Sequence, residues 1–146
     1  MVTELEGPWE FDRRVSNLLK RNLDDDEHIR FAIEGMGGQC IIALDERLLV
    51  VKPGSAVDAT YSGLVTSIRY SAIADIEVSQ SSSNRMIKIH TSDYHITEAH
   101  TGQGTAESKF FQLDDPDSIP IAKWTLKKYK PHLRELGELI REAKGT

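Results

Sequence analysis

The chain is 146 residues long, 39% hydrophobic and 28% charged, which is typical of one soluble globular domain. Its formal net charge of −5 argues against general binding to nucleic acid or to an anionic membrane, because both favour a basic surface. Apolar runs of only a few residues exclude a helix that spans a bilayer, and a single cysteine excludes a disulfide framework and a thiolate zinc site.

The first eleven residues contain acids where a signal peptide needs basic residues and an apolar block. We therefore expect a cytoplasmic protein in which residues 1–146 form a single domain.

Residues 8–23 have apolar side chains at a spacing of three to four, which predicts an amphipathic helix with Pro8 in its first turn. The apolar positions are Trp9, Phe11, Val15, Leu18, Leu19 and Leu23. Residues 1–23 are thus expected to form an N-terminal helical extension, and the acidic run 24–27 to form a solvated turn.

From Glu27 the apolar period changes to two, which predicts a half-buried strand through Phe31 that ends in a glycine-rich turn at 35–38. The segment Ile41–Lys52 places two short apolar runs on either side of Asp45-Glu46, the pattern of a β-hairpin. Cys40 precedes the first run and is expected to be a small buried hydrophobic residue rather than a reactive thiol.

Further short strands are predicted before residue 113. They lie at 64–70, 76–78 after a bend at 71–75, and 109–113, with an edge strand around 57–61. The segments Met86–Thr91 and Tyr94–Glu98 are predicted to form a hairpin around Ser92-Asp93, because Ile87, Ile89, Tyr94 and Ile96 then share one face. This register places His90 directly opposite His95.

The C-terminal segment 117–146 is predicted to be helical, with Asp117 or Ser118 as its cap and Pro120 in its first turn. Its apolar residues step by four and three and form one stripe: Ala122, Leu126, Tyr129, Leu133, Leu136, Ile140 and Ala143. Pro131 interrupts this stripe, which leaves open either one kinked helix or two consecutive helices.

The predicted elements describe an α+β domain: an N-terminal helix, about seven strands in a strongly bent antiparallel sheet or open barrel over 24–113, and a closing helix. Leu44–Val51 resembles the strand-turn-strand signature T-D-x-R-L of bacterial pleckstrin-homology-like domains, with Leu44 where the family usually has Thr. Tyr70–Ile76 is similar to the segment that follows in that family. The resemblance covers about residues 23–111. It implies a bent barrel capped by a C-terminal helix, a binding or scaffolding role, and homo-oligomers in some relatives.

Three histidines form the candidate metal site. If the predicted register holds, His90 and His95 lie about 5 Å apart between Cβ atoms, and His100 on the next loop is a possible third ligand. The alternative is two surface histidines on a polar face, because no carboxylate or cysteine completes the site.

A basic cluster in the C-terminal segment is the second candidate site. Its members, with no acid between them, are Lys123, Lys127, Lys128, Lys130 and Arg134. It is either the solvated face of an amphipathic helix, an anionic-lipid surface, or a surface that docks an acidic partner, a nucleic-acid backbone or an acidic run of a second copy.

Three large aromatic residues, Trp9, Phe11 and Trp124, are candidate partner anchors, although aromatic residues on helices are more often core. The glycine-rich turn Glu34–Gln39 contains no base, which disfavours a head-group phosphate site there. Asp45, Glu46 and Arg47 at the hairpin tip are given no catalytic role, and no nucleophile-elbow spacing occurs.

The sequence therefore predicts a non-catalytic pleckstrin-homology-like module that binds another protein or itself, with no cofactor and no small-molecule substrate. A peripheral membrane or anionic-lipid binder that uses residues 123–134 is the alternative. A metal-dependent enzyme at His90 and His95 is the third hypothesis.

Overall fold

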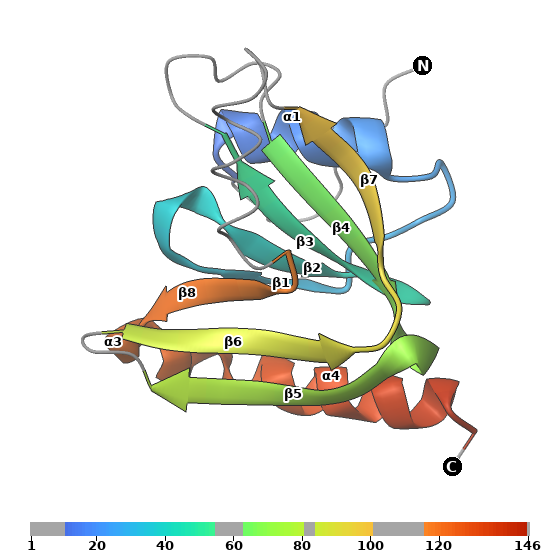
Figure 1. Cartoon of the computed structure of the whole chain (residues 1–146), viewed down its shortest axis with the longest axis vertical. Coiled ribbons are helices and arrows are strands. Elements are labelled where there is room, and N and C mark those ends of the chain that lie inside the picture. Colours follow the sequence, from blue (N-terminus) through green and yellow to red (C-terminus); the bar gives the residue numbers. More distant parts are fainter. Residues whose placement is uncertain (1–10, 55–62, 81–83, 101–115, 146) are drawn as a thin grey trace.

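Two antiparallel sheets and the helices packed on them make up the computed structural model, which describes residues 11–54, 63–80, 84–100 and 116–145 (Figure 1). The first sheet has the strand order β1-β2-β3-β4-β7. Its strands are β1 (Phe31–Glu34), β2 (Cys40–Ala43), β3 (Arg47–Pro53), β4 (Gly63–Arg69) and β7 (His95–His100). The second sheet has the order β5-β6-β8, with β5 (Ile73–Gln80), β6 (Asn84–Thr91) and β8 (Ser118–Ala122).

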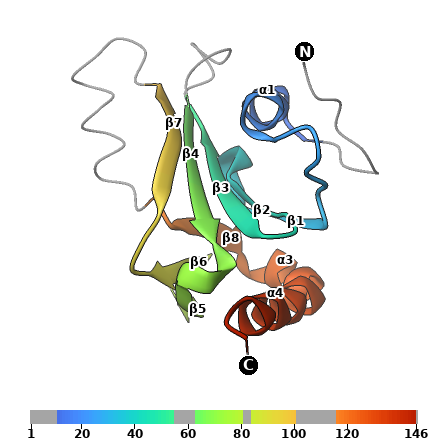
Figure 2. The same cartoon turned by 90° about the vertical axis from the view of Figure 1, so that its right-hand side faces the viewer.

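The predicted α+β class is confirmed, because the two sheets form an unclosed barrel with a helix at each end of the chain (Figures 1 and 2). The helices are α1 (Arg13–Asn22), α3 (Lys123–Leu126) and α4 (Lys130–Ala143), with 3-10 turns η1 (Met36–Gly38), η3 (Tyr70–Ala72) and η4 (Lys127–Tyr129). None of the described helices is long and apolar enough to cross a membrane.

The predicted central hairpin is confirmed as β2 and β3, which pair from Cys40 opposite Val51 to Ala43 opposite Leu48. Both faces of this hairpin are buried, because alternate side chains point into two different apolar clusters. Ile41 and Val50 belong to the barrel interior, whereas Cys40 belongs to the cluster beneath α1.

Helix α1 covers the outer face of the five-stranded sheet (Figure 2). It begins after Asp12, whose side chain accepts a hydrogen bond from the backbone N–H of Arg14, and it buries Val15, Leu18 and Leu19 against that sheet. The prediction of a half-buried first strand is wrong for this reason: Ala32, on the face assigned to solvent, is buried under α1. The predicted helix start at Pro8 lies outside the described residues.

The barrel interior is closed by α4. Leu136, Leu139 and Ile140 of this helix pack with the inward-facing isoleucines of both sheets, and Tyr129 and Leu133 extend the contact. The predicted apolar stripe is thus confirmed as core packing, except that Ala143 at its end is exposed.

The glycine-rich turn before β2 is confirmed: Gly37 and Gly38 have positive φ angles of 67° and 80°, which glycine adopts without strain. The chain approaches β8 closely here, because a Cβ at Gly35 would overlap the carbonyl oxygen of Pro120. Strand β4 matches the prediction for 64–70. The bend predicted at 71–75 falls earlier, at η3, so β5 is longer than expected.

The predicted hairpin between 86–91 and 94–98 is wrong. Strand β6 pairs with β5 over seven residue pairs on one edge and, through Asn84–Lys88, with β8 on the other. Strand β7 crosses to the first sheet and pairs with β4, with His95 opposite Ser67. Consequently Tyr94 and Ile96 are 39% and 50% exposed instead of sharing a buried face with Ile87 and Ile89.

The predicted helix start at 117–120 is also wrong. Residues Ser118–Ala122 form β8, in which Ile119 and Ile121 point into the core, and the helical run begins only at Lys123. Pro131 lies in the first turn of α4, directly after η4, so the alternative of consecutive helices holds. The strands predicted at 57–61 and 109–113 lie outside the described residues.

Candidate functional site

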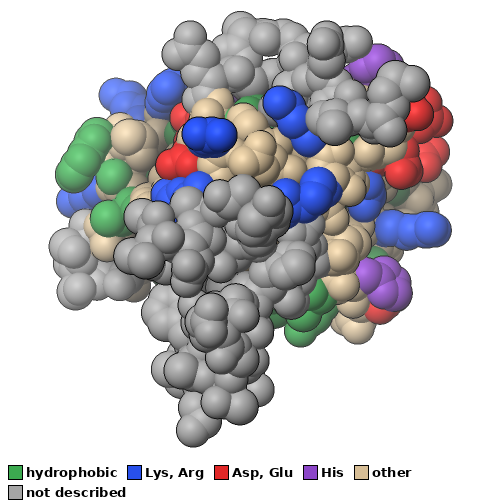
Figure 3. Space-filling model, turned by 90° about the horizontal axis from the view of Figure 1, so that it is seen from above, with side chains coloured by type: hydrophobic (Ala, Val, Ile, Leu, Met, Phe, Trp, Pro, Cys, Tyr) green, Lys and Arg blue, Asp and Glu red, His purple; other side chains and the backbone are tan. Residues whose placement is uncertain are grey.

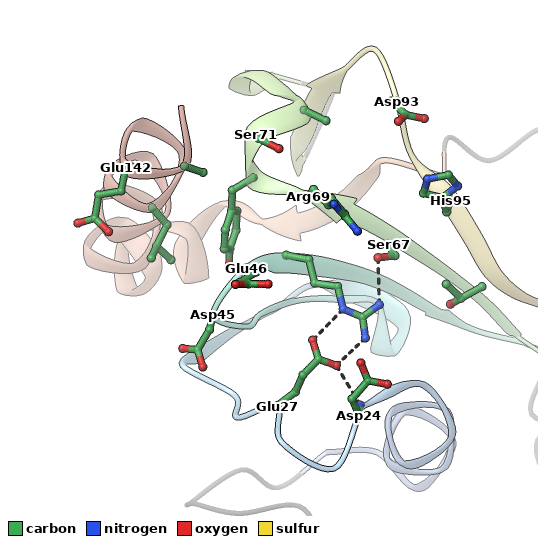
Figure 4. Close-up of a pocket in the computed structure, with 16 residues that line it drawn as sticks. Asp24, Glu27, Asp45, Glu46, Ser67, Arg69, Ser71, Asp93, His95 and Glu142 are labelled. Carbon is green, nitrogen blue, oxygen red and sulfur yellow. Dashed lines mark hydrogen bonds and ion pairs between the residues drawn. The ribbon is translucent and has the colours of Figure 1, made fainter. Parts of the chain in front are cut away.

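A pocket of about 960 Å³ opens at the end of the barrel where the β2–β3 turn, η3, the β6–β7 connection and the C-terminal end of α4 meet (Figure 4). Six carboxylates line it: Asp24, Glu27, Asp45, Glu46, Asp93 and Glu142. Two guanidinium groups, those of Arg47 and Arg69, and the imidazole of His95 also line it. Apolar atoms come from Tyr70, Ala72, Leu139 and Ala143. We call this site the acidic pocket.

Arg47 is fixed at one side of the acidic pocket by Glu27. Its Nη2 and Nε donate to the two carboxylate oxygens at 2.6 and 2.9 Å, and Nη1 donates to the Ser67 hydroxyl at 3.0 Å (Figure 4). Burial raises the pKa of Glu27, but the hydrogen bonds from Arg47 and from the backbone N–H of Asp24 outweigh it and hold that pKa below its usual range. The Arg47 charge is therefore already compensated within the pocket.

The remaining carboxylates give the acidic pocket its charge. The lining has six carboxylates against two guanidinium groups, and one of the carboxylates, Asp45, is also ion-paired at 3.3 Å with Arg30 outside the lining. Glu46, Asp93 and Glu142 are exposed on its rim, and no ion pair joins them to another described residue. Figure 3, a view from above, shows a group of acidic side chains at its right-hand side.

The opposite end of the molecule has a basic and aromatic surface. Trp124 of α3 is 81% exposed, and Lys123, Lys127 and Lys128 beside it are exposed as well. The Lys128 ammonium lies 5.3 Å from the centroid of the Tyr129 ring, which belongs to the core. We call Lys123, Trp124, Lys127 and Lys128 the Trp124 face; Lys130 and Arg134 are exposed further along the same helical run.

The other aromatic candidates differ from Trp124. Phe11 is partly buried and packs against the cluster beneath α1, which is a structural role. Trp9 lies outside the described residues. Of the two that the structure describes, only Trp124 is presented to solvent.

The metal hypothesis required His90 and His95 to face each other on paired strands, and the structure places them in different sheets. His90 lies in the second sheet, where its Nε2 is 2.6 Å from a carboxylate oxygen of Glu77, while His95 lies in the first sheet on the rim of the acidic pocket. The side chain of His100 lies outside the described residues. Within the described part of the chain, no three His, Cys, Asp or Glu side chains are grouped as a metal site would require.

Burial keeps two further side chains, those of Cys40 and Tyr70, in their protonated forms. Burial raises the pKa of the Cys40 thiol far above its usual value, in agreement with the expected small hydrophobic residue. Burial likewise raises the pKa of Tyr70, whose hydroxyl donates to the Leu44 carbonyl oxygen.

The acidic pocket was not predicted from the sequence, because the residues that line it come from five separate segments of the chain. Glu27 stood in an acidic run that reads as a solvated turn, and Arg47 in a hairpin tip to which no role was given. Glu27 and Arg47 are twenty positions apart, and no local sequence pattern links residues at that separation. Their opposite charges were the one sequence feature that could have indicated the contact.

The structure is similar to two solved bacterial structures. One is described as a DUF1696 family protein with a pleckstrin-homology domain from Shewanella loihica PV-4; it is 17% identical, with 66% of this chain and 84% of that chain covered and a TM-score of 0.38. The other is a pleckstrin homology domain from Shewanella amazonensis SB2B, 17% identical, with 71% and 87% covered and a TM-score of 0.42. No protein-family model and no curated protein matches the chain. The descriptions of both structures name a pleckstrin-homology domain, and the likeness concerns the fold alone.

Proposed function

We propose that this domain is a non-catalytic binding module that holds another protein through the Trp124 face. The observation that supports the proposal is the 81% exposure of Trp124 on a helical segment that is packed onto the barrel. A side chain of this size normally buries most of its surface, and large aromatic residues dominate the energetics of protein interfaces.

The lysines define the chemistry of the partner. Lys123 precedes Trp124, Lys127 and Lys128 follow it by three and four positions, and no acid occurs between residues 118 and 134. An acidic protein surface with an apolar recess would bury the indole and compensate the ammonium groups at the same time.

An anionic lipid surface is the second candidate, because a tryptophan flanked by lysines also suits a membrane interface. The net charge of −5 and the acidic pocket oppose it, since the whole molecule is repelled by an anionic surface. The protein partner is therefore the function that the charges favour.

The test is photo-crosslinking from position 124, with a benzophenone amino acid in place of Trp124 in the full chain expressed in its source cells. We expect protein adducts that disappear when Lys127→Glu and Lys128→Glu are added. The matched control carries the same amino acid at Val78, an exposed residue of β5.

Adducts identical to those of the Val78 control, or unaffected by the lysine substitutions, contradict the proposal. Co-sedimentation of the purified chain with phosphatidylglycerol vesicles, lost in Trp124→Ala, would move the function to the lipid candidate.

A further inference from the structure

We propose that the acidic pocket binds the carboxyl-terminal end of a peptide that also carries a positive charge, with Arg69 holding the carboxylate. The pocket has a volume of about 960 Å³, in the upper part of the range of about 300–1,000 Å³ that is usual for ligand pockets. No residue of the Trp124 face lines it. The inference therefore goes beyond the proposed function and assigns the chain a second, separate ligand.

Strand pairing places a set of hydrogen-bond donors on one wall of the acidic pocket. Arg69 lies directly opposite Arg47 on β3, and Ser67 lies directly opposite His95 on β7. Paired residues of neighbouring strands point to the same face of a sheet, with Cβ atoms about 4.5–5.5 Å apart. Figure 4 shows Arg69 projecting into the centre of the pocket, with Ser67 and His95 on the same wall. Guanidinium, hydroxyl and imidazole groups in adjacent positions are the donors that bind an anionic group.

Arg69 is the guanidinium of this wall that is available to a ligand. Arg47 donates to Glu27 and to Ser67, whereas no ion pair or hydrogen bond joins Arg69 to another described residue. Like charges directly opposite each other destabilise a sheet, so the stability of the first sheet does not explain a second arginine beside Arg47. The planar fork of a guanidinium matches a carboxylate, which it can bind with two parallel hydrogen bonds.

Ser67 supplies a second donor. Its side chain is buried at 8% exposure and accepts a hydrogen bond from Arg47. Its own O–H donates to no acceptor in the described part of the chain. A buried hydroxyl proton of this kind is stabilised when an acceptor is supplied from outside. A carboxylate bound to Arg69 would provide that acceptor.

The rim of the acidic pocket determines which anion can enter. Glu46, Asp93 and Glu142 are exposed there and form no ion pair with another described residue. These carboxylates repel a ligand that has negative charge alone. A ligand that carries an ammonium or guanidinium group together with its carboxylate is attracted by the rim and by Arg69 at the same time.

The apolar part of the lining suits a peptide. Apolar atoms of Tyr70, Leu139 and Ala143 line the pocket along with the charged groups, so an apolar side chain next to the carboxylate can be buried there. Capture of a terminal carboxylate is a recurring mode of peptide recognition. A peptide that ends in an apolar residue, with a lysine or arginine two positions before it, therefore matches the donors, the apolar atoms and the rim.

The experiment is an NMR titration of the ¹⁵N-labelled full chain with the tripeptide Lys-Ala-Leu. We expect saturating shifts of the backbone amide signals of Ser67, Arg69 and His95, with a dissociation constant below about 1 mM. The signals of the Trp124 face should not move. The same tripeptide with a carboxyl-terminal amide is expected to bind at least about tenfold more weakly, because the charge that Arg69 holds is removed.

A third peptide, Lys-Ala-Leu with an acetylated amino terminus, distinguishes two sources of the ligand. It represents the carboxyl terminus of a protein, in which the chain continues on the amino side. Binding as tight as that of the free tripeptide assigns the pocket to protein termini. Binding of the free tripeptide alone assigns it to short free peptides.

Substitutions test the two charged contacts separately. Arg69→Gln is expected to weaken Lys-Ala-Leu binding at least about tenfold, and thermal unfolding should be unchanged because Arg69 is exposed and has no described partner. Arg13→Gln, at an exposed position of α1, is the matched control and should bind like the wild type. Glu46→Gln with Glu142→Gln should weaken Lys-Ala-Leu binding about two- to fivefold. The same pair should not weaken acetyl-norleucine-Ala-Leu, which has no positive charge.

Four results overturn the inference. They are the absence of saturable shifts with Lys-Ala-Leu, equal binding of the free and amidated forms, and unchanged binding in Arg69→Gln. The fourth is inorganic phosphate that binds as tightly as the tripeptide, since the pocket would then accept an anion without a positive charge. None of these results changes the adducts expected from position 124, so the proposed function is tested separately.

Discussion

At the scale of single residues, the Glu27–Arg47 ion pair forms part of the wall of the acidic pocket. Both side chains are less than one-fifth exposed, and Arg47 also donates to the backbone carbonyl of Asn22 and to Ser67. One guanidinium thus ties the end of α1, the acidic turn and β4 together. Removal of Glu27 would leave the partly buried Arg47 cation without its counter-charge. The resulting loss of folding free energy is larger than the loss from breaking an exposed ion pair.

Glu27→Gln is expected to lower the free energy of unfolding by about 1–3 kcal/mol at pH 7. Because the folded pKa of Glu27 lies below its ordinary value of 4.5, the stabilisation is complete above pH 4.5 and is lost as the pH falls through the lower, folded value. Urea unfolding at pH 7 and at about pH 3 checks this: the difference between wild type and variant should shrink at the acid end.

Asp26→Asn, in the same acidic run but exposed, is the matched control and should change the free energy of unfolding by less than about 0.5 kcal/mol at either pH. A Glu27→Gln difference that is the same at both pH values would show that the ion pair is not its source.

At the scale of elements, α4 combines a buried stripe with a weak helix interior. Gly137 lies in the middle of the helix, and a Cβ at this position would meet only the flexible end of Arg141 at 3.7 Å. Glycine in a helix interior costs backbone entropy that alanine does not.

Gly137→Ala is expected to raise the free energy of unfolding by about 0.5–1 kcal/mol, measured by thermal or urea unfolding. Gly35→Ala is the contrasting substitution, because its Cβ would overlap the Pro120 carbonyl oxygen where the β1 end approaches β8. It should destabilise by about 1–3 kcal/mol. A destabilising Gly137→Ala would mean that α4 needs its flexibility at this point.

At the scale of the whole molecule, the five-stranded sheet separates two apolar clusters. One fills the barrel between the sheets and α4, and the other lies between the sheet and α1. Because β2 and β3 supply side chains to both clusters, neither can loosen without exposing the other face of the same strands.

Leu19→Ala, at a fully buried position of α1, is expected to lower the free energy of unfolding by about 2–5 kcal/mol, by loss of burial and by the cavity left behind. Leu19→Ala should lower the stability reported by circular dichroism and the hydrogen-exchange protection of the Tyr70 backbone N–H by the same free energy, although Tyr70 belongs to the other cluster. Arg13→Ala, exposed on the same helix, is the control; separate transitions for the two probes would show that α1 is an independent unit.

The sequence by itself determined the elements whose signals are local. The hairpin from Cys40 to Pro53 follows from two apolar runs and a two-residue polar break, because hairpin register depends on residues only a few positions apart. The amphipathic faces of α1 and α4 follow from helical spacing alone, since burial of an apolar stripe needs no knowledge of its partner.

Only the tertiary structure decided which strands are neighbours and which side chains meet. His90 and His95 read as a cross-strand pair, but His90 pairs with Asp75 of β5 in one sheet and His95 with Ser67 of β4 in the other. Ser118 and Pro120 read as a helix start, but pairing with β6 buries Ile119 and Ile121 and outweighs the weak capping signal. The acidic pocket depends on the same kind of pairing, because its carboxylates come together only when distant segments meet at one end of the barrel. Strand pairing over long stretches of chain is set by the total burial of the fold, which no local pattern encodes.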